Sequence, residues 1–144
     1  MKSIYLSDMS FKKIIYVFLC LAFLTSCYEK GPVVSFRSKT ERVSNTWEVS
    51  FAFDMNSLGD ITQYYSDWNY LLTINQDGSF METMDSMGQT LSLEGYWTFQ
   101  KNDQNMRRIY STGDTLEVYI LKLQEKKLWF RTKDNSLELQ LRAH

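Results

Sequence analysis

The chain has 144 residues, of which 44% are hydrophobic, 15% are aromatic and 23% are charged. This length accommodates a single domain, and the apolar content is too high for a disordered chain and sufficient for a packed core. The formal net charge of −1 lacks the basic excess of nucleic-acid-binding proteins, so nucleic acid is excluded as an expected partner.

The first predicted element is a secretory signal peptide over residues 1–26. An uninterrupted apolar run at residues 14–24 follows Lys12 and Lys13 and precedes small polar residues, which is the three-part layout of an export signal. A permanent transmembrane helix needs roughly 20 apolar residues, about twice the length of this run. Cleavage of the segment is therefore expected rather than a membrane span.

The segment ends in Leu24-Thr25-Ser26-Cys27, which resembles the lipobox of bacterial lipoproteins. The resemblance implies a diacylglyceryl group on the Cys27 thiol, cleavage just before Cys27, and acylation of the new amino terminus, for example by palmitate. Because each buried methylene contributes about 0.8 kcal/mol, two or three acyl chains hold a protein on a membrane. We predict lipidation of Cys27 and a place in the cell envelope, lipid-anchored to a bacterial membrane such as the outer membrane and facing the periplasm or the surface; the residues after Cys27 do not specify which membrane or leaflet. The alternative is an ordinary signal peptide followed by a chance cysteine.

The chain after the signal peptide divides into a tether and a domain. Residues 27–45 are mostly polar and contain Gly31-Pro32, so they are predicted to form the lipidated cysteine and its tether. A lipocalin-like β-barrel domain is predicted over residues 46–144, because apolar and polar residues begin to alternate at Thr46. Residues 54–67 are predicted to be a long loop.

Alternation with period two predicts about eight strands, separated by turn signals such as Asp77-Gly78. The strands are expected over residues 46–53, 69–75, 79–84, 91–99, 107–111, 115–123, 128–132 and 137–142. No window shows a sustained helical period, so an antiparallel meander is expected, and closure into an up-and-down barrel removes its exposed edges. The residues expected in the barrel interior are Trp47, Val49, Phe51, Leu72, Ile74, Phe80, Leu93, Trp97, Phe99, Val118, Ile120, Leu128, Phe130, Leu139 and Leu141.

Four segments of the domain carry a family resemblance. They are NTWEV at 45–49, LTINQDGSF at 72–80, EGYWTF at 94–99, and YILKL followed by LWF within 119–130. In order and spacing they resemble the small lipocalin-like domains of Bacteroidetes lipoproteins. The chain departs from the classical lipocalin pattern in having Asn45 where those proteins have glycine, and in lacking a late helix. The resemblance implies an all-β barrel fold and an envelope location, and it specifies no ligand.

The sequence offers few residues for catalysis or metal binding. His144 is the only histidine, which excludes histidine-based triads and multi-histidine metal sites. Glu82 and Glu94 are the carboxylates considered for an enzyme, but both are expected to face outward from their strands. No catalytic residue, metal or cofactor is therefore predicted.

Aromatic residues are the candidates for ligand binding. Tyr65, Trp68 and Tyr70 lie in and after the predicted loop, where they could close over an apolar ligand at a barrel mouth. Trp97 and Phe130 are added from the predicted strands. The alternative for all five is packing in the core and at the rim, since barrel strands are commonly aromatic.

Two functions remain open at this point. The first is a noncatalytic, lipid-anchored protein that binds a small apolar ligand in its barrel. The second is an envelope interaction or assembly subunit with a filled barrel that contacts another protein. A connected cavity of at least about 300 Å³ favours ligand binding, whereas a filled interior favours the second function. An enzyme would need convergent carboxylates in a cleft.

Overall fold

Two short helices and nine strands occur in the part of the chain that the structure, a computed structural model, describes, namely residues 37–101 and 103–144. In chain order they are α2 (Lys39–Val43), β1 (Thr46–Asp54), β2 (Gly59–Asp60), α3 (Thr62–Asp67), β3 (Leu71–Ile74), β4 (Ser79–Ser86), β5 (Gln89–Gln100), β6 (Asn105–Tyr110), β7 (Thr115–Gln124), β8 (Lys127–Thr132) and β9 (Leu137–Ala143). No helix within these described ranges is long and apolar enough to cross a membrane. The predicted signal peptide, Cys27 and the first part of the predicted tether lie outside the described residues.

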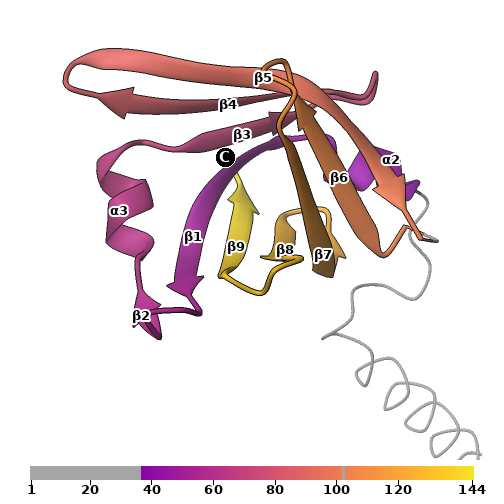
Figure 1. Cartoon of the computed structure of the whole chain (residues 1–144). Coiled ribbons are helices and arrows are strands. Elements are labelled where there is room, and N and C mark those ends of the chain that lie inside the picture. Colours follow the sequence, from indigo (N-terminus) through magenta and orange to yellow (C-terminus); the bar gives the residue numbers. More distant parts are fainter. Residues whose placement is uncertain (1–36, 102) are drawn as a thin grey trace, which may run out of the picture. The chain divides into compact units, whose positions relative to one another are not determined.

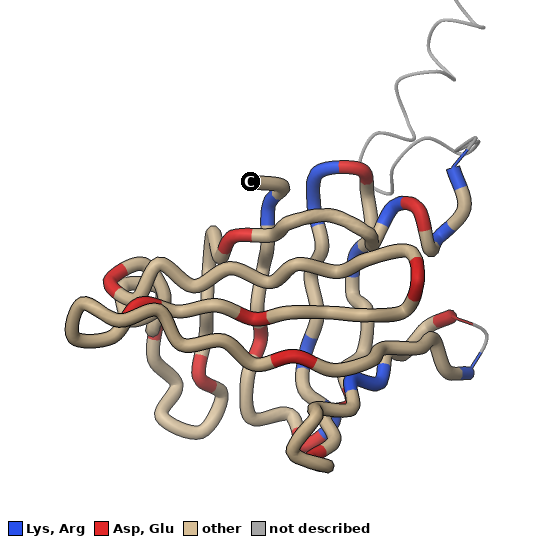
Figure 2. The backbone as a smooth tube through the Cα atoms, turned by 90° about the horizontal axis from the view of Figure 1, so that it is seen from above, with Lys and Arg blue, Asp and Glu red and all other residues tan. Residues whose placement is uncertain are grey.

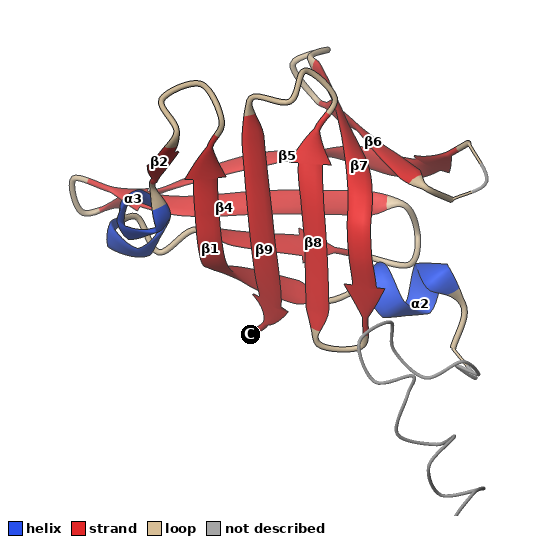
Figure 3. Ribbon diagram, turned by 90° about the horizontal axis from the view of Figure 1, so that it is seen from below, coloured by secondary structure: helices blue, strands red, loops and turns tan. Residues whose placement is uncertain are grey.

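The strands form one antiparallel sheet that closes on itself. The order is β1-β3-β4-β5-β6-β7-β8-β9, and β9 pairs back with β1, from Trp47 opposite Ala143 to Asp54 opposite Leu137. Strand β2 adds only a two-residue pairing beside the end of β1. Figures 1 and 3 show the neighbouring strands β1, β9, β8 and β7 on one side of the barrel, with β4 and β5 on the other. The prediction of an all-β, up-and-down barrel of eight strands is confirmed.

Alternating strand directions give the barrel two different ends. At one end lie α2 and the turns at residues 75–78, 101–104 and 125–126, and we call this the closed end. At the other lie α3, the β4–β5 turn and the loops at residues 111–114 and 133–136, and we call this the open end. The chain enters the described fold at Arg37, at the closed end.

Helix α2 belongs to the folded unit, although its residues fall in the predicted tether. The Ser38 side chain accepts a hydrogen bond from the Glu41 amide at 3.1 Å, and the Glu41 carboxylate accepts one from the Ser38 amide at 2.6 Å, which forms a capping box. Val43, at the end of the helix, is fully buried, and its carbonyl accepts a 2.8 Å hydrogen bond from Nε1 of Trp47. The folded unit therefore begins before residue 46.

The core is made of inward-facing residues from the whole ring of strands. Residues 36–144 form one compact unit that contains the complete sheet and this core, so the unit has what it needs to fold alone. Its buried hydrophobic residues are Val43, Trp47, Ala52, Leu72, Ile74, Phe80, Trp97, Met106, Val118, Leu128, Phe130, Leu139 and Leu141.

Two predicted core residues lie elsewhere. A bulge in β1 between Val49 and Phe51 reverses the alternation of faces. Ala52 then turns inward opposite Leu139, and Phe51 faces outward opposite Gln140. The prediction that Phe51 lies in the interior was wrong, because the alternation of apolar and polar residues does not indicate where a strand contains an extra residue.

Leu93 was also predicted to be buried, but 42% of its surface is exposed. It lies opposite Glu82, whose side chain points into the barrel, so Leu93 faces inward as expected. The neighbouring strand β6, however, ends at Tyr110 opposite Gly95. The last contact on this side is the 2.8 Å hydrogen bond from the Ser111 amide to the Glu94 carbonyl, so Leu93 lies just past the end of β6 and is open to solvent at the rim of the open end.

Candidate functional site

The barrel contains a cavity of about 240 Å³ at its open end. This volume is below the roughly 300 Å³ of typical drug-sized ligand pockets but above the roughly 150 Å³ of an engineered cavity that binds benzene. It has room for one ring with a few substituents. The cavity is lined by Tyr64, Tyr65, Trp68, Tyr70, Glu82, Met84, Arg108, Tyr110, Leu116, Phe130, Thr132, Leu137 and Leu139.

Helix α3 and the residues after it supply the aromatic rim of the cavity. The rings of Tyr64 and Tyr65 meet edge to face with centroids 5.6 Å apart, Tyr64 contacts Trp68 at 5.2 Å, and Tyr65 contacts Tyr70 at 5.3 Å. The Trp68 carbonyl accepts a 2.6 Å hydrogen bond from the Asp85 amide, which ties the end of the helix to β4. The rim is therefore a connected aromatic cluster held against the β4–β5 hairpin.

The wall of the cavity contains a buried ion pair. Arg108 on β6 is 2% exposed, Glu82 on β4 is 6% exposed, and the guanidinium donates to Oε1 of Glu82. The sequence has no lysine or arginine over residues 43–100, so only acidic positions are coloured on the strands of that segment in Figure 2. For a pair between two strands, the cation therefore has to come from β6 or a later strand. Such a pair lowers the cost of burying each charge.

Two tyrosine hydroxyls complete this polar cluster. The Tyr110 hydroxyl donates a 3.0 Å hydrogen bond to Oε1 of Glu82. Burial raises the pKa of Tyr110 to about 12, and burial likewise raises the pKa of Tyr70 well above its ordinary value, with the negative charge of Glu82 acting in the same direction. Both hydroxyls therefore remain protonated, and able to donate hydrogen bonds, at neutral pH.

Besides its ion pair with Glu82, Arg108 lies near the faces of two aromatic rings and has one donor without a partner in the described residues. Its guanidinium carbon lies 5.8 Å from the ring centroid of Phe80 and 5.4 Å from that of Phe130. Burial disfavours the charged guanidinium, but interactions with Tyr70, Glu82 and Tyr110 outweigh this effect and raise the pKa of Arg108. Nε of Arg108 is buried and has no hydrogen-bond partner among the described residues.

Comparison with known proteins bears on the fold. A solved lipocalin-like protein from Bacteroides uniformis ATCC 8492 superimposes with a TM-score of 0.55, covering 72% of this chain and 99% of that protein, at 11% sequence identity. The fold is lipocalin-like. No family model matches the sequence, and no curated protein is significantly similar to it. The lipocalin-like part of the predicted resemblance is thus supported at the level of fold.

The lipocalin-like barrel brings four of the five predicted ligand residues together. Tyr65, Trp68, Tyr70 and Phe130 all line the cavity at the open end. Trp97 is buried near the closed end, where its Nε1 donates a 2.9 Å hydrogen bond to the Asn75 carbonyl. Ligand binding by the four residues stays a prediction, and Trp97 lies outside the cavity.

The most informative residues of the site were missed by the sequence analysis. Glu82 was predicted to face outward, and this was wrong, whereas Glu94 is exposed as expected. A signal was present, because Glu82 shares its strand parity with the interior residue Phe80, and Arg108 shares its parity with Met106. Opposite charges at inward positions of two strands indicate a buried pair rather than two solvated side chains.

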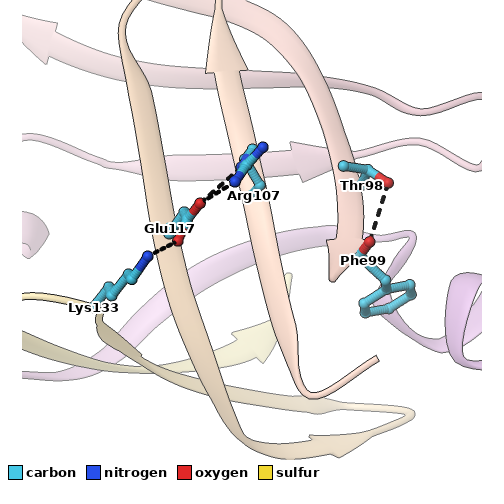
Figure 4. A network of polar contacts seen from close by, with 5 residues as sticks. All are labelled: Thr98, Phe99, Arg107, Glu117 and Lys133. Carbon is cyan, nitrogen blue, oxygen red and sulfur yellow. Dashed lines mark hydrogen bonds and ion pairs between the residues drawn. The ribbon is translucent and has the colours of Figure 1, made fainter. Parts of the chain in front are cut away.

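The outer face of β6–β8 carries a second polar network. Glu117 accepts hydrogen bonds from Arg107, with Nε at 2.8 Å, and from Lys133, and the two interactions lower the pKa of Glu117 to about 2 (Figure 4). All three residues are on the solvent side of the sheet, and 41% of the Arg107 side chain is exposed. Exposed ion pairs of this kind contribute little to stability and form no enclosed site. Arg107 and Arg108 are adjacent in sequence, but Arg107 forms an ion pair at the solvent-exposed face and Arg108 is buried in the cavity wall.

Proposed function

We propose that this protein is a noncatalytic binding protein whose lipocalin-like barrel holds one small, largely apolar molecule in the cavity at its open end. The observation that carries the proposal is that the barrel interior is not filled by its own side chains, since a cavity of about 240 Å³ remains. Its lining is mostly aromatic and aliphatic with a few polar groups, as in small-molecule sites generally. The cavity is smaller than the roughly 300 Å³ named above for a ligand-binding barrel, so the proposed ligand is limited to about one ring, whereas a barrel that only contacts another protein needs no cavity of this kind.

The proposal extends to where the protein works. Lipid on Cys27 would hold the chain on a membrane of the bacterial cell envelope, and this rests on the lipobox resemblance. The described part of the chain begins at Arg37, at the closed end of the barrel, and the cavity lies at the other end.

The anchor predicts a defined mass on one residue. Protein purified from its producing bacterium is expected to begin at Cys27 and to carry a diacylglyceryl group on the thiol. Mass spectrometry of the amino-terminal peptide measures this directly. A free Cys27 thiol, or a mature chain that begins elsewhere, would contradict the proposed anchoring and leave the barrel's binding function as a separate question.

Narrowing the cavity is expected to weaken binding. Leu116 lies on β7 in the cavity lining, so Leu116→Phe inserts additional volume where the ligand is proposed to lie. We expect an affinity loss of about tenfold or more for any molecule that copurifies with the protein, measured by equilibrium dialysis. Leu121→Phe is the matched control, because Leu121 is on the same strand with 46% of its surface exposed outside the cavity. Equal affinities for the two variants would show that the ligand binds elsewhere.

A further inference from the structure

The charges that line the cavity determine which ligands it can accept. Glu82 and Arg108 are the acidic and basic side chains among the lining residues, and they are paired with each other. The cavity wall is therefore electrically balanced before any ligand enters. An additional charge brought into it would be buried without a counter-ion, which is costly in an apolar interior.

A carboxylate ligand meets a specific obstacle in this arrangement. To reach Arg108 it must approach Glu82, whose Oε1 already accepts from both Arg108 and Tyr110. Two carboxylates near one guanidinium repel each other, and one of them must lose its charge or its partner. Fatty-acid-like anions are therefore disfavoured in the cavity.

A neutral oxygen, in contrast, is matched by residues of the cavity wall that can donate hydrogen bonds. Arg108 lines the cavity and its buried Nε has no partner in the described residues, and Tyr65 and Tyr70 belong to the same lining. Leaving a buried donor unsatisfied is unfavourable, and a ligand oxygen that accepts a hydrogen bond in this cluster removes part of that cost.

We propose that the cavity selects uncharged molecules of about one ring in size that carry a hydrogen-bonding oxygen, such as a phenol, an alcohol or a ketone, and discriminates against carboxylates. This inference rests on the proposed binding function and specifies the class of ligand. The oxygen lies beside the guanidinium of Arg108, and the apolar body of the ligand lies against the aromatic rim formed by Tyr65 and Trp68.

Three probes of similar size separate the possibilities. Toluene, 4-methylphenol and 4-methylbenzoate are titrated at neutral pH into the fragment of residues 28–144, which contains the complete barrel, and binding is followed by protein NMR. We expect 4-methylphenol to bind about tenfold more tightly than toluene or 4-methylbenzoate, because one hydrogen bond to a charged group contributes about 1.5 kcal/mol or more. The shifted resonances should include those of Tyr65, Phe130 and Leu139.

Changing the charge balance provides the matched test. In Glu82→Gln the guanidinium loses its counter-ion, so 4-methylbenzoate can supply one and is expected to bind at least about tenfold more tightly than it binds the original protein. Glu94→Gln, on the exposed face of the same hairpin, should leave all three affinities unchanged. A merely structural role for Glu82 would weaken all three probes alike.

Each outcome has a distinct meaning. If none of the probes binds the unaltered fragment, the proposed binding function fails together with this inference. If they bind in the cavity but 4-methylbenzoate is the tightest, or toluene equals 4-methylphenol, binding stands and the selection for neutral oxygen is wrong. Should Glu82→Gln fail to fold, as judged by circular dichroism, the ranking of the probes on the unaltered fragment decides the inference alone.

Discussion

Arg108→Met is expected to lower the free energy of unfolding by about 3–5 kcal/mol, since it leaves a carboxylate buried without its cation. Arg108 is 2% exposed, and its guanidinium contacts Glu82 and the faces of Phe80 and Phe130. Methionine replaces much of the side-chain volume but none of the charge. Urea denaturation of the fragment of residues 28–144, followed by tryptophan fluorescence, measures the loss.

Two controls isolate the buried charge as the cause. Arg107→Met changes the neighbouring residue on the solvent side of the strand and should lower stability far less. The double variant Glu82→Leu, Arg108→Met removes both charges and should recover most of the stability, because an apolar pair replaces an ionic one. An Arg108→Met variant as stable as the original protein would mean that the pair is not buried as described.

Gly95→Ala is expected to lower the free energy of unfolding by about 3 kcal/mol through a clash between neighbouring strands. A Cβ at residue 95 would overlap the Ile109 carbonyl oxygen and lie 2.8 Å from the Cα of Tyr110, so β6 must move to accept it. Replacing glycine also restricts the unfolded chain, but that gain is below about 1 kcal/mol and does not offset the clash. Urea denaturation gives the difference.

Gly59→Ala is the matched control for this substitution. The nearest atom to a Cβ at Gly59 is Oγ of Ser57 at 3.3 Å, which belongs to a flexible side chain at the surface. Its effect on stability should stay within about 0.5 kcal/mol. If the two alanine variants were equally stable, β5 and β6 could not approach as closely at Gly95 as the structure has them.

Alternation and turn residues were sufficient to predict the barrel. Each face of a strand repeats every second residue, and Asp77-Gly78 allows the tight turn between β3 and β4, where Gly78 adopts a φ of 89°. These are local properties, so they are visible in sequence. The eight strands predicted correspond to β1 and β3–β9.

What the sequence did not reveal depends on contacts between distant residues. Helix α2 has one capping box and a single buried residue, Val43, and helix α3 spans only Thr62–Asp67, so neither shows a helical period. The inward position of Glu82 makes sense only with Arg108, 26 residues later. Pairing across the barrel, rather than local preference, places both charges in the cavity wall.

The candidate site was predicted in part for a similar reason. Tyr65, Trp68 and Tyr70 are close in sequence, so their gathering at the open end follows from one short segment. Trp97 shares their aromatic character, but it lies in the half of β5 that reaches the closed end. Their aromatic character suggested all four residues as ligand contacts. Whether a residue lines the cavity or packs in the core depends on the end of the barrel at which it lies, and that requires the strand directions.

Native mass spectrometry of the protein isolated from its producing cells tests the central claim most directly. A barrel that binds a small neutral molecule should give a noncovalent complex with one such molecule, and denaturing the protein should release it. The fraction of protein in this complex should be lower for Leu116→Phe and unchanged for Leu121→Phe. A spectrum showing only the empty protein, or the same bound molecule at equal occupancy in both variants, would contradict it.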